Sequence, residues 1–134
     1  MQLFGGDFKK IAEACRQAPD IHRDICYQSM GRDVGGVYAR NPQGAIVACL
    51  NAPDGQFRLS CIGGAVQDSF WDPTGQDDAI RFCSLLVKKS EKDACYATII
   101  GRAPQVLASQ GELTTFCGKV ERDYQQVCKE RLSI

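Results

Sequence analysis

Apolar residues recur along the chain in a pattern that predicts a series of short helices. The residues four places and one place before Cys15, Cys49, Cys83 and Cys117 are all apolar. Positions −4, −1 and 0 lie on one face of an α-helix, so each of these cysteines is expected to end a helix of about ten to twelve residues. The apolar positions are Ile11, Ala14, Ala45, Ala48, Ala79, Phe82, Leu113 and Phe116.

Helix start signals lie shortly upstream of each of the four segments. Each signal is a residue whose side-chain oxygen can accept a hydrogen bond from an amide of the first turn. Two are strengthened, one by a proline at the first helical position and one by a glutamate three residues later, which completes a capping box. The signals are Asp7, Asn41-Pro42, Thr74 three residues before Asp77, and Ser109 with Glu112.

The cysteines themselves repeat at a nearly constant interval. The four named above are evenly spaced with a period of about 34 residues, the length of a helical repeat unit. Four trailing cysteines follow the same period almost as regularly. Such regularity indicates a tandem array within a single domain, residues 1–134. The trailing cysteines are Cys26, Cys61, Cys95 and Cys128, and the units span about 7–40, 41–74, 75–108 and 109–134.

A second helix in each unit is expected to carry the trailing cysteine. Turn residues around Pro19 and Pro53 precede it in two units. Glycines follow the trailing cysteine in three units, and they indicate close helix approach or, as an alternative, a groove that faces a ligand. These glycines are Gly31, Gly63, Gly64 and Gly101, while Gly35-Gly36 is expected in a loop or at a helix end.

The paired cysteines are expected to form one disulfide in each unit. The two members of a pair lie at similar distances on either side of the turn, so they face each other in an antiparallel helical hairpin. Helix axes about 8–10 Å apart bring inward-facing Cα atoms to roughly 4–5 Å, close to disulfide range. The expected bridges are Cys15–Cys26, Cys49–Cys61, Cys83–Cys95 and Cys117–Cys128.

An alternative arrangement places both cysteines of a pair on one helix, as in the twin C-x9-C hairpins of the mitochondrial intermembrane space. Pro19 and Pro53 would then lie inside a helix, where proline removes a hydrogen bond. On a continuous helix, the spacing of Cys49 and Cys61 would also rotate the second cysteine about 120° away from the first. The sequence therefore favours the hairpin.

A helix–turn–helix unit of about 34 residues resembles the tetratricopeptide repeat in length, and one disulfide per hairpin is similar to the Sel1-like repeat proteins of secreting bacteria. The tetratricopeptide consensus residues are absent and the cysteine spacing differs from the shorter Sel1-like one, so no functional residue is carried over. The resemblance implies an all-α fold, a right-handed α/α-hairpin solenoid of four ~34-residue repeats with one disulfide in each, and a concave surface suited to protein or peptide binding.

Charge and cysteine content narrow the function classes. The 16 basic and 16 acidic residues cancel, which gives no electrostatic argument for nucleic acid or an anionic membrane as partner. No apolar run approaches the roughly 20 residues of a membrane span. Eight regularly spaced cysteines favour an oxidising compartment, the periplasm or the extracellular space. The first residues lack the apolar stretch of a signal peptide, and the natural chain is expected to be longer.

Catalytic chemistry has little support in the residues. The single histidine, His22, lies early in a predicted helix, where a surface role is expected. The usual nucleophile, zinc-protease and phosphate-loop motifs are absent, so we expect no enzyme, no cofactor and no metal site. Cysteines at C-x10-C and C-x11-C spacing are too far apart to chelate zinc locally, although a reduced, thiol-lined bundle could hold Cu(I).

Four aromatic residues are the candidates for contact with a partner. Phe70 and Trp71 end the second helix of unit 2, and they are expected to pack against the next unit or to form an exposed anchor. Tyr27 and Tyr96 each follow a trailing cysteine. This equivalent placement favours a repeated packing role over ligand contact.

These observations favour a non-enzymatic, exported repeat scaffold that mediates protein–protein interaction by presenting a rigid surface to another protein or peptide. Two alternatives belong to other classes. One is a helical protein that holds a small apolar ligand or cofactor between its helices, with glycines and aromatic residues lining the slot. The other is a thiol-based metal-binding or redox protein.

Overall fold

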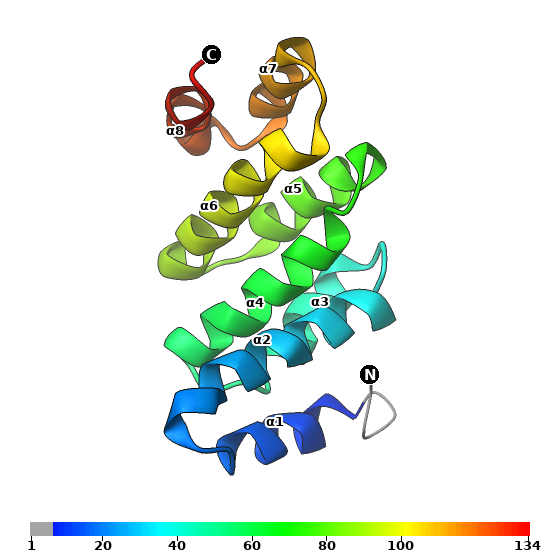
Figure 1. Ribbon diagram of the computed structural model, residues 1–134, viewed down its shortest axis with the longest axis vertical. Coiled ribbons are helices and arrows are strands. Elements are labelled where there is room, and N and C mark those ends of the chain that lie inside the picture. Colours follow the sequence, from blue (N-terminus) through cyan, green and yellow to red (C-terminus); the bar gives the residue numbers. More distant parts are fainter. Residues whose placement is uncertain (1–6) are drawn as a thin grey trace.

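The computed structural model describes residues 7–134, which form helices joined by short turns (Figure 1). No strand occurs in this part of the chain, so the fold is all-α, as the sequence predicts. The helices are α1 (Phe8–Arg16), α2 (Asp20–Val37), α3 (Pro42–Cys49), α4 (Gln56–Ser69), the short η1 (Pro73–Gly75), α5 (Gln76–Leu85), α6 (Lys89–Val106), α7 (Gln110–Lys119) and α8 (Arg122–Leu132).

Consecutive α-helices form four hairpins, and one disulfide close to the turn links the two helices of each. The paired Cα atoms lie 5.4–5.7 Å apart. The first helix of each hairpin has 8–10 residues, slightly fewer than expected. The bridges are Cys15–Cys26, Cys49–Cys61, Cys83–Cys95 and Cys117–Cys128, which is the pairing that the repeat predicts.

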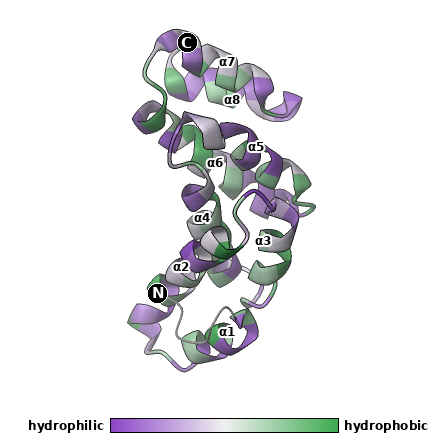
Figure 2. Ribbon diagram, turned by 90° about the vertical axis from the view of Figure 1, so that its right-hand side faces the viewer, coloured by the Kyte–Doolittle hydropathy of each residue, from purple (hydrophilic) through white to green (hydrophobic). Residues whose placement is uncertain are grey.

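The hairpins follow one another along the long axis of the molecule, with α1 and α8 at opposite ends (Figure 1). The second helices pack in order, α2 against α4, α4 against α6 and α6 against α8. Figure 2 shows hydrophilic and hydrophobic residues interspersed along the helices, and the apolar ones join into a single buried cluster. None of the helices in residues 7–134 combines the length and the apolar character that a membrane span requires.

Three helix starts follow the sequence signals. The side-chain oxygens of Asp7, Asn41 and Ser109 each accept a hydrogen bond at 3.2 Å from the backbone amide three residues later. Pro42 occupies the first position of α3, where the amide that proline lacks would have no partner within the helix. These helix starts are therefore set by local chemistry.

The fourth predicted start is wrong. Thr74 does not cap α5. Instead, Asp72 accepts a hydrogen bond from the backbone amide of Thr74 at 2.9 Å and another from its hydroxyl group, and so caps η1. α5 then begins at Gln76. The aspartate takes this role because it precedes Pro73, which suits the first position of a helical turn.

Two glycines allow α2 and α4 to cross at short distance. A Cβ atom on Gly31 would lie 2.1 Å from the carbonyl oxygen of Cys61, and one on Gly64 would lie 2.3 Å from that of Gln28. Any larger residue at either position would push the two backbones apart. Close helix approach, predicted from the glycines, is confirmed at these two positions.

The same prediction is wrong at Gly63 and Gly101, where an added Cβ would meet nothing within 4 Å. Gly35 and Gly36 lie in the last turn of α2, at a helix end as expected. A Cβ atom on Gly35 would lie 2.8 Å from the carbonyl oxygen of Ala65 in α4. Neighbouring helical residues differ by about 100° in direction, and only the docked structure reveals which glycine faces the partner.

Ala14 is exposed, although the pattern places it on the buried face of its helix. The buried residues of α1 are Phe8, Ala12 and Cys15, which form a narrow stripe that excludes it. The corresponding residues of the later hairpins, Ala48, Phe82 and Phe116, are buried. The first helix of the described chain therefore buries fewer residues than α3 and α5.

In the first and fourth hairpins, the side chain three residues before the trailing cysteine donates hydrogen bonds to carbonyl groups at the end of the first helix or in the turn after it. Arg23 donates to the carbonyl oxygen of Ala18 through Nε at 3.3 Å and through Nη2 at 3.0 Å. Gln125 donates to the carbonyl oxygens of Gly118 and Val120, each at 3.1 Å. The bonds of Gln125 satisfy carbonyl groups that the end of α7 leaves without a partner in the helix, and those of Arg23 satisfy a carbonyl group of the turn after α1.

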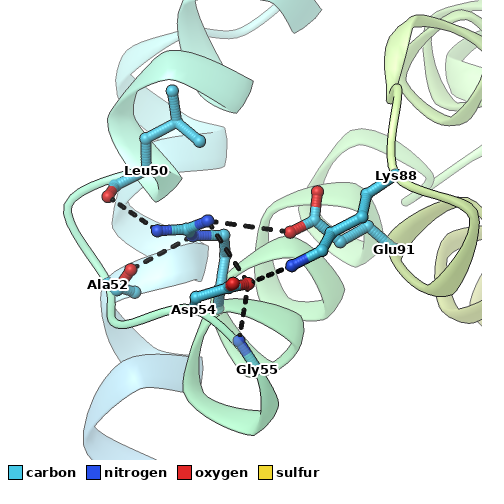
Figure 3. Close-up of polar contacts among 7 residues, drawn as sticks. Leu50, Ala52, Asp54, Gly55, Lys88 and Glu91 are labelled. Atoms are coloured by element: carbon cyan, nitrogen blue, oxygen red, sulfur yellow. Dashed lines mark hydrogen bonds and ion pairs between the residues drawn. The ribbon is translucent and has the colours of Figure 1, made fainter.

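Arg58 is the equivalent residue of the second hairpin, and its side chain also reaches Glu91 of the third. Its partners Leu50, Ala52 and Glu91 are labelled in Figure 3. Its Nε and Nη2 donate to the carbonyl oxygens of Ala52 and Leu50 at 3.1 Å and 3.3 Å. Its Nη1 lies 3.9 Å from a carboxylate oxygen of Glu91, which is buried at the start of α6. The charge of Glu91 therefore has a compensating partner from the preceding hairpin.

We predict that Gly64→Ala destabilises the fold and that Gly63→Ala does not. The methyl group at position 64 meets the Gln28 carbonyl group, and forcing the helices apart costs about 1–3 kcal/mol. At position 63 the better helix propensity of alanine leaves stability unchanged or raises it by up to about 1 kcal/mol. Urea denaturation of the oxidised proteins, followed by circular dichroism, measures both effects. Equal midpoints for the two variants would contradict the close crossing.

Candidate functional site

Two neighbouring aromatic residues at the end of α4 lie in different environments. Phe70 is buried, and its ring stacks on that of Phe116 from α7 at a centroid distance of 5.6 Å. Trp71, the only tryptophan of the chain, is 71% exposed. Phe70 therefore packs against a later hairpin, while Trp71 lies at the surface.

Arg102 of α6 holds the Trp71 ring in place. Its guanidinium carbon lies 4.7 Å from the ring centroid, within the range of a cation–π contact. Its Nε donates a hydrogen bond at 2.6 Å to the carbonyl oxygen of Phe70. One arginine thus supports the exposed ring and also satisfies the backbone group next to it.

A surface hollow of about 220 Å³ lies beside Trp71. Its walls come from the C-terminal halves of α2, α4 and α6, and its arginines outnumber its acidic residues. We call it the basic hollow, and its lining residues are Arg32, Gln67, Asp68, Trp71 and Arg102.

A second hollow of about 170 Å³ also includes Trp71 and contains mainly acidic charge. We call it the acidic hollow. Hydrogen bonds from the hydroxyl and the amide of Thr74 hold the pKa of Asp72, one of its residues, below its ordinary value. The charged residues that line it are Arg40, Asp68, Asp72 and Asp78.

Asp68 lines both hollows and is partly buried. Burial raises the pKa of its carboxyl group above the ordinary value, the guanidinium of Arg32 lowers it, and Asp33 raises it. Arg32 therefore favours the charged form of Asp68, while burial and Asp33 oppose it.

Tyr27 and Tyr96 lie in the core between hairpins and not at the surface. The Tyr27 ring lies 5.1 Å from that of Phe57, and the Tyr96 ring lies 4.2 Å from that of Tyr124. In both cases the partner ring stands four residues before the next trailing cysteine. Of the four aromatic residues singled out in the sequence, only Trp71 is exposed.

The other chemical candidates do not meet in one place. His22 is exposed near the start of α2, and all eight cysteines are in disulfides. No group of three or more His, Cys, Asp or Glu side chains in residues 7–134 is arranged to hold a metal ion. Gly31 and Gly64 at the α2–α4 crossing face backbone atoms, and neither lines the two hollows described above. The metal and small-ligand hypotheses stay untested.

The residues of the basic hollow could have been predicted from their positions within the repeat units, although not from their residue types alone. Asp68 and Arg102 both stand seven residues after a trailing cysteine, and Arg32 and Gln67 both stand six residues after one. Equivalent positions on neighbouring second helices lie side by side when the hairpins stack. Aligning the units by the trailing cysteine would therefore have brought these four residues together.

Comparisons with known proteins add no further information, because no family model, curated protein or solved structure matches the chain.

We predict that the carboxyl group of Asp68 titrates above the ordinary aspartate value of 3.8 and that Arg32→Gln raises its pKa further. Asp54 is the control, because a hydrogen bond from Lys88 holds its pKa below that value. A carbon-13 NMR titration of the carboxyl groups measures both. Because folding raises the pKa of Asp68, its contribution to stability is present below the unfolded pKa and is lost as pH rises through the folded pKa. An Asp68 titration at or below that of Asp54 would contradict this description.

Proposed function

We propose that the chain is a non-enzymatic, exported helical repeat scaffold that presents Trp71 to a protein or peptide partner. The observation that carries the proposal is an indole ring that is 71% exposed and yet held in place by Arg102. Tryptophan is enriched among the residues that dominate binding energy at protein interfaces. A ring that is already fixed loses little conformational entropy when a partner covers it.

The repeat architecture belongs to the same proposal. Each hairpin contacts mainly its neighbours in the chain, through the series α2, α4, α6 and α8. This arrangement supports a solenoid of four units, which we propose to be right-handed, and in solenoids binding surfaces form across adjacent repeats. The residues around Trp71 come from three successive second helices, as such a surface requires.

An oxidising location, the periplasm or the extracellular space, also belongs to the proposal. Four disulfides within one chain are typical of compartments in which thiols are not kept reduced. A helical hairpin of about 30 residues buries too little surface to be stable alone. The bridges therefore suit a scaffold that works outside the cytosol.

We predict that Trp71→Ala removes partner binding without unfolding the protein. Loss of a central tryptophan costs at least about 2 kcal/mol, roughly a 30-fold loss of affinity. Val87→Ala is the matched control, because Val87 is 98% exposed in the turn between α5 and α6. Immobilised wild-type protein and both variants are incubated with extracellular or periplasmic proteins of the source organism, and quantitative mass spectrometry compares what each retains.

Proteins that bind wild type and Val87→Ala equally but are lost from Trp71→Ala would support the proposal. Thermal unfolding of each variant shows whether the fold is intact. Equal retention by folded Trp71→Ala would contradict an anchoring role for this residue.

A further inference from the structure

We propose that the basic hollow binds a carboxylate group of the partner segment that covers Trp71. The inference rests on the proposed function, because it assigns a chemistry to the partner of the same surface. The group is an acidic side chain or the free carboxyl end of a peptide. Both present the same two acceptor oxygens, and the experiment below distinguishes them.

Arg102 is positioned with most of its hydrogen-bond donors available. A guanidinium group has five N–H donors, and only the one on Nε is used, by the carbonyl oxygen of Phe70. No other described residue accepts a hydrogen bond from Arg102, and its side chain lines the basic hollow. The bond to Phe70 and the contact with Trp71 fix the direction of the remaining donors, which suits bidentate recognition of a carboxylate.

Arg32 supplies a second cation from the opposite side of the hollow. It belongs to α2, whereas Arg102 belongs to α6, and α4 packs against both helices. Gln67 of α4 adds an amide to the lining. A carboxylate has about four lone-pair sites, so it can accept hydrogen bonds from both arginines and from this amide.

The opposite net charges of the two hollows favour one orientation of the bound partner segment. The basic hollow has two arginines and one aspartate, a net charge of +1. The acidic hollow has one arginine and three aspartates, a net charge of −2. The sign therefore changes from one side of Trp71 to the other, and an acidic group is attracted only to the side of Arg32 and Arg102.

A carboxylate fits the basic hollow better than a phosphate group does. Asp68 lies within the lining, so an incoming anion also meets a negative charge. A single negative charge is matched by the net charge of +1, whereas a phosphate monoester carries about −1.5 to −2 at neutral pH.

The indole N–H of Trp71 gives a single NMR signal at the site, because the chain has no other tryptophan. The probes are three pools of pentapeptides with blocked ends, random apolar residues and a central Glu, Gln or Lys. A fourth pool has a central Gln and a free carboxyl end, and inorganic phosphate is the fifth probe. We expect the Glu pool to shift the signal at about tenfold lower concentration than the blocked Gln pool, because hydrogen bonds to charged groups are worth about 1.5–3 kcal/mol. The Lys pool is expected to bind most weakly.

Three variants separate the charge effect from a loss of structure. Arg32→Gln is expected to abolish the tenfold preference for Glu, and Asp68→Asn is expected to strengthen binding of the Glu pool. These opposite changes cannot both arise from unfolding. Arg122→Gln is the control, because Arg122 is an exposed arginine on α8 and does not line the basic hollow. Its affinities should equal those of wild type.

The outcomes separate the inference from the proposed function. Equal affinities for the Glu and blocked Gln pools would overturn the carboxylate inference and leave the docking role of Trp71 in place. If no pool shifts the indole signal, the carboxylate inference is contradicted, and the docking role of Trp71 is decided separately by the retention experiment with Trp71→Ala. Binding of the free-carboxyl pool in preference to the Glu pool would identify the source as a peptide end. Tighter binding of phosphate than of either acidic pool would overturn the assignment to a carboxylate.

Discussion

The disulfide between the two helices of each hairpin is the constraint on which the rest of the structure depends. A hairpin of this size cannot bury a sufficient core, and a bridge across 11 or 12 residues contributes about 2–3 kcal/mol in the chain-entropy model. With the two helices held together, each hairpin offers fixed sides to its neighbours. The close crossing at Gly31 and Gly64, the paired aromatic rings and the buried Glu91 beside Arg58 all lie between hairpins. These contacts require hairpins in which the relative position of the two helices is already fixed.

Much of this fold could be predicted from the sequence because its determinants are local. The caps at Asp7, Asn41 and Ser109 involve residues three apart, and each cysteine pair spans one turn. The predictions that were wrong involve competition or rotation. Asp72 acts as a cap in place of Thr74 because it directly precedes Pro73, which takes the first position of η1. Gly64 but not Gly63 faces α2 because of how the helices are rotated.

The candidate site was only partly accessible to the same reasoning. Trp71 was singled out, but its exposure depends on where the backbone ends α4 and on the stacking of Phe70 against Phe116, a contact between residues far apart in the sequence. The polar residues around it come from three hairpins. Arg102 has two roles in the structure, towards the Phe70 carbonyl group and the Trp71 ring, and neither is visible in its own segment of sequence. Packing between hairpins therefore creates this surface.

The most direct test of the account is the disulfide map of the protein isolated from its natural compartment with free thiols trapped. Proteolysis without reduction, followed by mass spectrometry, identifies which cysteine-containing peptides are linked. The account predicts four linked pairs, one within each hairpin, and no trapped thiol. Eight trapped thiols would contradict both the stapled hairpin and the oxidising location, and bridges between different hairpins would contradict the stapled hairpin.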